Sequence, residues 1–307
     1  MTAIIEAIGL SRSFGGIPVV RDATLAVEPG EITALVGPNG SGKTTLMLML
    51  ATLLRPDDGI AKISGHETTG ETLRARAALG WMPDALGSWP QLTVRETLVA
   101  VCEMYGLRST AARGRAEELI ARTGLEQHAA QRTNTLSRGQ KQRLSLARAI
   151  AHRPRALLLD EPASGLDPEA RTSQRHMLHE LANEGVAVLV TSHVLDELDQ
   201  LATKVVFLRD GRTEAPATVE AALRQGQRWR LRSLDPAALE AALEAAAVPW
   251  STQQTLSGVA HLITAASETE ASALLAALVA AGVPIVEFGP ASSALEQAFM
   301  KLAEAQE

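Results

Sequence analysis

Residues 37–45 read Gly-Pro-Asn-Gly-Ser-Gly-Lys-Thr-Thr, and this stretch decides the fold. The segment before it, residues 31–36, predicts a buried strand, and the apolar segment after it, residues 46–54, predicts a packed helix. A strand, a glycine-rich turn with Lys and Thr, and a helix together are typical of a phosphate-binding loop. The sequence therefore predicts nucleotide binding at this loop, in preference to a chance glycine-rich turn.

The residue types in this loop match the chemistry of a polyphosphate. Glycines let the backbone curl so that successive N–H groups point inward at an anion, and the helix N-terminus adds a partial positive charge. Lys43 can reach the β- and γ-phosphates, and the Thr44 hydroxyl can ligate Mg²⁺. We expect the nucleotide to contact the whole loop: Gly37, Pro38, Asn39, Gly40, Ser41, Gly42, Lys43, Thr44 and Thr45.

The bulk composition, with 307 residues and a net charge of −6, fits a globular protein of about two domains. The acidic balance and the lack of interleaved basic and aromatic residues disfavour a nucleic-acid partner. Cys102 is the only cysteine, so no internal disulfide can form, and a reducing compartment fits. We expect no signal peptide, because a basic and then apolar N-terminal region is lacking. We expect no membrane span, because no run of about 18 apolar residues occurs.

Strands alternate with helices over residues 1–215, which indicates an α/β fold with a largely parallel sheet and a helical part at about 85–150. A change in composition marks a linker at residues 216–227. Residues 228–307 then follow the order β-α-β-β-α-β, which predicts a small α+β domain of ferredoxin-like topology. The sequence therefore predicts a nucleotide-binding domain and a smaller accessory domain.

An apolar run at residues 156–159 predicts a buried strand that ends in two acids, Asp160 and Glu161. Ligands of parallel sheets bind at the carboxyl edge of the strands, which would place these acids beside the phosphate loop. Asp160 would then hold Mg²⁺ through water, and Glu161 would polarise the attacking water. The alternative is a strand that simply ends in charges facing solvent. The presence of the phosphate loop favours the functional interpretation.

Residues 136–140, Leu-Ser-Arg-Gly-Gln, come at the start of another predicted helix, residues 137–151. Ser137 offers a hydroxyl, and the residues after it offer backbone N–H groups near the positive end of the helix dipole. Such a helix start can bind an anion, or it can be an ordinary N-cap. The residues alone leave both interpretations open.

Taken together, these motifs resemble the ATP-binding cassette (ABC) family of ATPases over residues 1 to about 215. The motifs follow the order of the family: Phe14 as an early aromatic, the Walker A loop 37–45, the signature loop 136–140, Walker B 156–161, the D-loop 165–167 and the H-loop 191–193. The signature loop is the most specific of them, because other phosphate-loop ATPases lack it.

The resemblance implies a role for each matching residue. Phe14 would stack on adenine, where the family usually has Tyr. Lys43, Thr44 and the loop amides would hold the phosphates of ATP and Mg²⁺. Glu161 would be the general base, and His193 would contact the γ-phosphate and orient the water. The milder alternatives are that Phe14 belongs to the core and that His193 caps a helix.

The resemblance also implies that two copies of the chain share each catalytic site. Ser137 and Gly139, with Gln140 beside them, would close on the γ-phosphate of ATP held by the second copy. Asp167 would lie in that interface and link the two sites. Each copy would thus complete the site of the other.

Two positions depart from the usual family pattern. Arg138 stands where the first Gly of the signature is commonest, a change that the family tolerates. Asp84 stands where the Q-loop normally has Gln, and an ionised Asp is shorter and donates no hydrogen bond. Asp84 could still hold a metal-bound water, so it stays a candidate for catalysis and for the metal.

The last helix contains Leu295-Glu296-Gln297-Ala298-Phe299, which looks like the Leu-Glu-x-x-Phe ending of single-cassette drug, antibiotic and polysaccharide exporters of the bacterial ABC-2 type. This implies a peripheral energy-coupling ATPase on the cytoplasmic face of the membrane, with an integral permease as its partner. An apolar groove for the permease would be formed by Met82, Trp89, Leu98, Val101 and Tyr105, unless these pack within the protein. The alternative function is a soluble ABC ATPase with a regulatory or scaffold C-terminal domain.

Overall fold

The computed structural model describes residues 2–85, 87, 89–219, 227–255 and 258–304, and the chain divides into two compact units. Unit 1 comprises Met1–Glu214, and unit 2 comprises Ala215–Glu307. Most of the linker expected from the sequence, residues 220–226, lies outside the described residues. In the part of the chain that is described, no helix combines the length and the apolar character needed to cross a bilayer.

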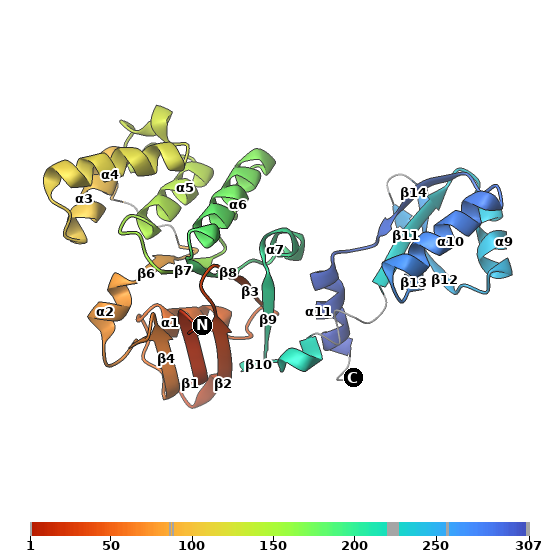
Figure 1. Cartoon of the computed structure of the whole chain (residues 1–307), viewed down its shortest axis with the longest axis horizontal. Helices are drawn as coiled ribbons and strands as arrows, with labels where there is room; N and C mark the ends of the chain where they lie inside the picture. Colours follow the sequence, from red (N-terminus) through yellow and green to blue (C-terminus); the bar gives the residue numbers. More distant parts are fainter. Residues whose placement is uncertain (1, 86, 88, 220–226, 256–257, 305–307) are drawn as a thin grey trace. The chain divides into compact units, whose positions relative to one another are not determined.

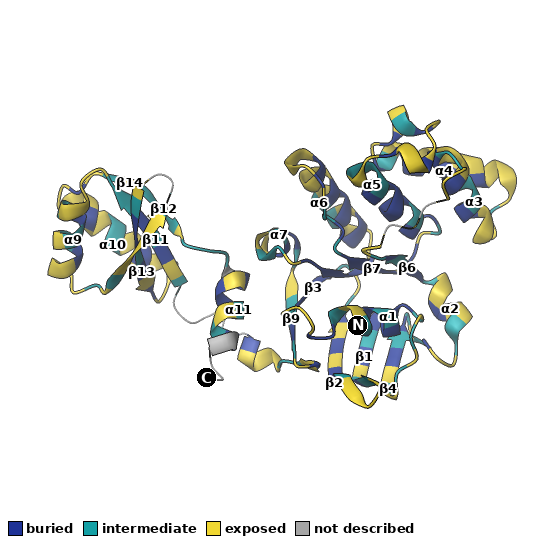
Figure 2. Cartoon of the chain, turned by 180° about the vertical axis from the view of Figure 1, so that it is seen from behind, coloured by how far each residue is buried: buried dark blue, intermediate teal, exposed yellow. Residues whose placement is uncertain are grey.

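Unit 1 is built on a six-stranded sheet with the strand order β10-β9-β3-β8-β7-β6. Its strands are β3 (Ile32–Val36), β6 (Leu79–Met82), β7 (Ala156–Asp160), β8 (Ala187–Thr191), β9 (Lys204–Arg209) and β10 (Arg212–Thr213). All neighbours pair in parallel except β10 and β9. Every residue of β3, β7 and β8 is buried (Figure 2), which explains why these segments are nearly continuous apolar runs. The predicted α/β class with a largely parallel sheet is confirmed.

A second, antiparallel sheet in unit 1 has the order β2-β1-β4-β5. Its strands are β1 (Ile5–Phe14), β2 (Ile17–Val27), β4 (Asp58–Ile63) and β5 (His66–Glu67). Helix α1 (Lys43–Leu50) lies between the two sheets (Figure 1), and its apolar side chains join both sheets in one core. Because α1 follows the phosphate loop directly, this core fixes the position at which the loop ends.

The remaining helices of unit 1 surround the central sheet or extend from it. They are α2 (Thr72–Ala77), α3 (Val94–Met104), α4 (Ser109–Arg122), α5 (Arg138–Ala149), α6 (Pro168–Asn183) and α7 (Leu195–Leu201), with 3-10 turns at Glu126–His128 and Thr133–Thr135. Helices α3, α4 and α5 gather on one side of the unit (Figure 1), within the region where the sequence predicts a helical part. The signature loop therefore belongs to this helical group, because it starts α5.

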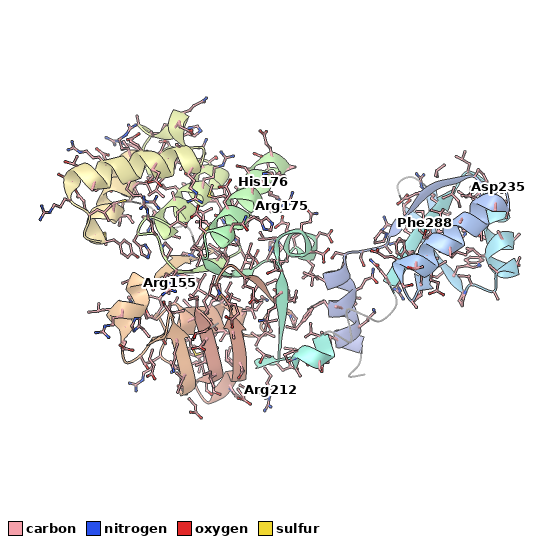
Figure 3. All side chains as sticks on the ribbon, viewed as in Figure 1. Arg155, Arg175, His176, Arg212, Asp235 and Phe288 are labelled. Atoms are coloured by element: carbon pink, nitrogen blue, oxygen red, sulfur yellow. The ribbon has the colours of Figure 1, made fainter. Side chains whose placement is uncertain are left out.

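Unit 2 contains a four-stranded antiparallel sheet in the order β12-β13-β11-β14. Its elements are β11 (Gln227–Ser233), α9 (Pro236–Ala245), β12 (Trp250–Thr255), β13 (Gly258–Ala265), α10 (Glu268–Ala280), β14 (Ile285–Pro290) and α11 (Ala294–Glu304). Asp235 caps α9 by accepting a hydrogen bond from Ala238 N at 3.0 Å, and Phe288 stacks on Trp229 in the core, with ring centroids 5.1 Å apart (Figure 3). The predicted order of elements is confirmed.

Gly80 in β6 shows how tightly α5 packs on the central sheet. A Cβ at this position would overlap the carbonyl oxygen of Ala149 and would lie 2.8 Å from Cδ1 of Leu157. We expect Gly80→Ala to lower the free energy of unfolding by about 1–3 kcal/mol, because the helix backbone must move away. Urea unfolding measures this change.

The matched control is Gly114→Ala on α4, where open space surrounds the new Cβ and alanine favours the helix. This substitution should raise the free energy of unfolding by about 0.5–1 kcal/mol. If both variants shifted the unfolding midpoint in the same direction, the close contact of Gly80 with α5 would be refuted.

Candidate functional site

The phosphate loop joins the end of β3 to the first turn of α1 and packs closely on neighbouring strands. A Cβ at Gly37 would overlap the carbonyl oxygen of Leu208, and a Cβ at Gly42 would lie 2.7 Å from the carbonyl oxygen of Val19. Gly40 and Gly42 have φ angles of 82° and 102°, in the region that favours glycine. The glycines are therefore required by the packing of the backbone as well as by its curvature.

Lys43, the first residue of α1, directs its ammonium group back into the loop. Its Nζ donates hydrogen bonds to the carbonyl oxygens of Gly37 at 2.7 Å and Pro38 at 3.1 Å. Burial lowers the pKa of this ammonium group, while the carboxylates of Glu161 and Asp160 act in the opposite direction. The loop thus holds a cation near the two acids at the end of β7.

The other polar groups of the loop fit a nucleotide with Mg²⁺. Ser41 Oγ is buried and has no hydrogen-bond partner among the described residues, and a phosphate oxygen is an acceptor that would satisfy it. Thr44 is exposed on the first turn of α1, and Asp160 is buried at the end of β7. A hydroxyl and a carboxylate are oxygen ligands of the kind that Mg²⁺ prefers.

The two acids are held by strand β8 beside them. Asp160 Oδ1 accepts a hydrogen bond from the Thr191 hydroxyl at 2.6 Å, and both residues are buried. Glu161 N donates to the carbonyl oxygen and to the hydroxyl of Thr191, each at 3.2 Å. The φ angle of Glu161 is 54°, a left-handed value that is costly for a glutamate. Contacts from outside its own segment must therefore hold Glu161 in place.

His193 contacts the side chain of Glu161 just beyond the end of β8. Its Nδ1 lies 2.7 Å from Glu161 Oε2, and the His193 side chain is 66% exposed while that of Glu161 is 19% exposed. The N-cap of the following helix α7 is Val194, not His193. The alternative in which His193 caps a helix is wrong, and the structure brings the histidine to the acid instead.

Ser137 and Gln140 form a capping box at the start of α5. Ser137 Oγ accepts a hydrogen bond from Gln140 N at 3.2 Å, and Gln140 Oε1 accepts one from Ser137 N at 2.8 Å. Asp167 caps α6 in a similar way, because its Oδ1 accepts from Ala170 N at 2.8 Å. The N-cap interpretation of Ser137 is confirmed, and the residue is exposed at the N-terminus of α5.

Phe14 and Asp84 are both exposed, and neither belongs to the cluster of Lys43, Asp160, Glu161 and His193. Phe14 is 45% exposed, and the Arg12 guanidinium lies 5.0 Å from the centroid of its ring. The alternative that Phe14 belongs to the core is therefore wrong. Among the described residues, Asp84 makes no hydrogen bond or ion pair with the acids or the loop.

Three of the five residues that the sequence places in a groove for the permease are core residues, which corrects that prediction. Met82, Leu98 and Val101 are buried and cannot contact a partner, whereas Trp89 and Tyr105 are exposed. Apolar residues occur both in protein cores and in docking grooves, so the residue types alone could not separate the two. At these three positions the side chains pack within the protein and do not form a docking groove.

The contacts by which two residues hold the acids were missed at the level of the sequence. One residue is Thr191, whose hydroxyl contacts both acids. The other is Gln142 of α5, which is 1% exposed and donates from Nε2 to the carbonyl oxygen of Glu161 at 2.8 Å. The sequence contains a signal for Gln142. This residue precedes Leu146 by four positions, so both lie on the buried face of α5. A polar side chain on a buried face requires a hydrogen-bond partner.

The site as a whole lies at the carboxyl ends of parallel strands, where β3 leads into the phosphate loop and β7 and β8 supply the acids and the histidine. Sheets of this kind bind their ligands at that edge. A phosphate loop with a lysine, an acid pair and a histidine in contact with one of the acids defines a phosphate-loop nucleotide hydrolase.

Comparison with known proteins narrows this class to a family. Residues 20–164 match the family model for the ABC transporter. The linearmycin resistance ATP-binding protein of Bacillus subtilis is 31% identical over 215 residues, which cover 70% of this chain and 69% of that protein. The daunorubicin/doxorubicin resistance ATP-binding protein of Streptomyces peucetius is 38% identical over 217 residues, which cover 71% of this chain and 66% of that protein.

Solved structures agree with this result. A dimeric bacterial ABC transporter cassette has a TM-score of 0.64 and 27% identity, covering 69% of this chain and 97% of that one. The ATP-binding subunit of another ABC transporter has a TM-score of 0.65 and 28% identity, covering 69% of this chain and 88% of that one. The chain belongs to the ABC transporter ATP-binding proteins, so it binds and hydrolyses ATP, and the resemblance noted in the sequence is confirmed.

Proposed function

We propose that this ATPase is the energy-coupling subunit of an exporter, that it works as a nucleotide-sandwich dimer, and that it acts on a separate membrane-spanning subunit. The observation that carries the proposal is the cluster of Lys43, Asp160, Glu161 and His193 at one edge of the central sheet. Relatives that include antibiotic resistance ATP-binding proteins and a Nod factor export ATP-binding protein support the export direction. Dimeric cassettes among the similar structures support the dimer.

The phosphate loop would hold the triphosphate of ATP. Its N–H groups and the Lys43 ammonium would contact the phosphates, and the Ser41 hydroxyl would gain a partner. Thr44 and, through water, Asp160 would hold Mg²⁺, with Asp84 as a further candidate for a metal-bound water. When bound, the ion would supply positive charge that neutralises the phosphates. The remaining loop residues, Gly37, Pro38, Asn39, Gly40, Gly42 and Thr45, would line the same nucleotide.

Glu161 would act as the general base for hydrolysis. A water oxygen attacks the γ-phosphorus, Glu161 takes the proton of that water, and the bond between the γ-phosphorus and the β–γ bridging oxygen breaks to leave ADP and phosphate. The contact between His193 and Glu161 Oε2 supports this role, because it orients the carboxylate. His193 would also contact the γ-phosphate and orient the water.

Residues at the start of two helices in one copy would complete the site of another. Ser137, Gly139 and Gln140 at the N-terminus of α5 would contact the γ-phosphate held by the second copy, where the helix dipole favours an anion. Asp167 would lie in the same interface. Both capping residues are placed at helix starts and stay exposed at the surface of unit 1.

Unit 2 would be an accessory domain of ferredoxin-like topology. Its strand order, β12-β13-β11-β14 with every neighbour antiparallel, supports this assignment. We propose that residues 1–215 form the nucleotide-binding domain, with 216–227 as linker and 228–307 as the accessory domain. The dimer would sit peripherally on the cytoplasmic face of the membrane, bound to its integral permease and not to nucleic acid.

Phe14 offers a test of the adenine contact. We expect Phe14→Ala to raise the KM for ATP about fivefold or more, because stacking of a base on an aromatic ring contributes about 1–3 kcal/mol. The value of kcat should stay close to that of the wild type, because Phe14 makes no contact with the acids or the histidine. Phe14→Tyr, which keeps the ring, is the matched control and should leave the KM unchanged in the same steady-state assay. An unchanged KM in Phe14→Ala would remove Phe14 from the nucleotide site.

The proposed function as a whole is tested by sedimentation and by membrane fractionation. With a non-hydrolysable ATP analogue and Mg²⁺ the full chain should form a dimer, and co-expression with the integral permease should bring the chain into the membrane fraction. A chain that stays monomeric at saturating analogue would refute the nucleotide sandwich. A chain that dimerises but stays out of the membrane fraction would favour the soluble alternative.

A further inference from the structure

One face of α5 contacts the segment that follows β7, residues 161–165, at two points. Arg138 Nη2 donates a hydrogen bond to the Ser164 hydroxyl at 2.8 Å. Gln142 Nε2, four residues along the helix, donates to the carbonyl oxygen of Glu161 at 2.8 Å. Residues four apart lie on the same face of a helix, so a single face of α5 reaches both ends of this segment.

The arginine contact is a packing contact as well as a hydrogen bond. Gly165 has a φ angle of 77°, and a Cβ at this position would lie 2.6 Å from Cδ and 2.8 Å from Nε of Arg138. The stem of the arginine therefore lies against the backbone of Gly165 in the D-loop. A Cβ at Gly139 would come 3.3 Å from Cδ2 of Leu166, so the start of α5 and the D-loop are closely packed.

The glutamine contact acts on a strained residue. Glu161 keeps its left-handed backbone because Thr191 accepts a hydrogen bond from its N–H and Gln142 donates one to its carbonyl oxygen. Gln142 is buried, so the loss of this bond would leave a buried amide and a carbonyl unsatisfied. The orientation of Glu161 therefore depends on where α5 lies.

Helix α5 thereby joins parts of the chain that serve two different ATP molecules in the proposed dimer. Ser137, at its N-terminus, would contact the ATP held by the second copy. Glu161, on the segment that α5 contacts, would act on the ATP held by its own phosphate loop. A movement of α5 at one ATP would be transmitted to the base at the other.

We propose that Arg138 and Gln142 are positioning residues that couple the two ATP sites of the dimer. They make α5 and residues 161–165 move together, so that closure of Ser137 on one ATP places Glu161 correctly against the other. This proposal rests on the nucleotide-sandwich dimer proposed above. A glycine at position 138, the commonest residue of the signature there, has no side chain to reach Ser164, so the arginine contact distinguishes this chain from that pattern.

The test is the cooperativity of ATP hydrolysis by the full chain. We expect Arg138→Ala and Gln142→Leu to bring the Hill coefficient for ATP down toward one and to lower kcat about tenfold, the effect of one lost hydrogen bond to a charged or buried group. The binding of a non-hydrolysable analogue to the phosphate loop of a single copy should stay unchanged, because neither residue belongs to that loop. Arg138 is exposed, so its removal should leave the protein folded, which the thermal midpoint checks.

Three further variants test whether the effect comes from the contact between Arg138 and Ser164. Lys141→Ala removes a charge from the same helix without touching the D-loop, and it should behave as the wild type. Arg138→Lys, which keeps the positive charge and a hydrogen-bond donor on a shorter side chain, should recover part of the cooperativity. Ser164→Ala should lower the Hill coefficient on its own and add little in the Arg138→Ala background, because the two residues form one contact.

Two outcomes would overturn the coupling. One is a wild-type chain that dimerises with the analogue but hydrolyses ATP with a Hill coefficient of one. The other is an Arg138→Ala variant that dimerises and keeps the cooperativity and kcat of the wild type. Failure of the wild type to dimerise at all is a different result, because it refutes the sandwich itself and the coupling with it.

Discussion

Glu161→Gln is expected to reduce ATP turnover by about 10²–10⁴-fold while ATP still binds, which is the usual contribution of a positioned general base. Glutamine has almost the same shape, and its amide oxygen can still accept a hydrogen bond from His193 Nδ1. The backbone contacts of residue 161 with Thr191 and Gln142 do not involve the carboxylate, so they remain. What is lost is the capacity to take a proton from water. ATP that binds but is not cleaved should therefore hold the dimer together longer.

Two measurements on the same protein decide this prediction. Phosphate release gives the turnover rate, and sedimentation with ATP and Mg²⁺ should show a persistent dimer in Glu161→Gln where the wild type gives a transient one. Glu126→Gln is the matched control, because Glu126 is an exposed glutamate on a 3-10 turn and should change neither readout. Near-normal hydrolysis by Glu161→Gln would remove Glu161 as the base and leave the proton to another group.

The secondary structure of unit 1 could be predicted where the local physics is strong. Helix α6 runs over Pro168–Asn183 as expected, because Asp167 caps its start and Pro168 fits the first helical position. The buried strands β7 and β8 could be predicted because both are short, nearly uninterrupted apolar runs. The order of the strands and the place of α1 between two sheets could not be predicted, because they depend on contacts between segments far apart in the chain.

The site shows the same division between local pattern and distant contact. Lys43 and Glu161 could be recognised from local patterns. Lys43 ends a glycine-rich loop that follows a strand, and Glu161 is the second of two acids at the end of a buried strand. The hydrogen bond between Thr191 and Asp160 spans 31 positions of the sequence, and no local sequence pattern predicts it. The apolar residues assigned to a docking groove show the opposite error, because Leu98 satisfies both a core and a surface interpretation until its burial is known.

Lys43→Ala is expected to weaken ATP binding by about 10- to 100-fold and to abolish measurable turnover. The ammonium group lies between the carbonyl oxygens of Gly37 and Pro38, in reach of the acids at the end of β7. Each lost hydrogen bond to a charged phosphate costs about 1.5–3 kcal/mol. The charge that develops on the γ-phosphate during cleavage would also lose a stabilising protein cation, which is a typical electrostatic contribution to catalysis.

A charge-preserving variant separates electrostatics from geometry at this position. Lys43→Arg keeps the positive charge, but its planar and larger guanidinium cannot donate to both loop carbonyls from the same space, so we expect it to restore binding in part and turnover hardly at all. Equilibrium binding of a fluorescent ATP analogue and phosphate release measure the two effects, with Lys141→Ala as the control for loss of a surface charge. If Lys43→Ala hydrolysed ATP at the wild-type rate, residues 37–45 could not be the loop that holds the γ-phosphate. The proposed roles of Glu161 and His193 would then lose the substrate on which they act.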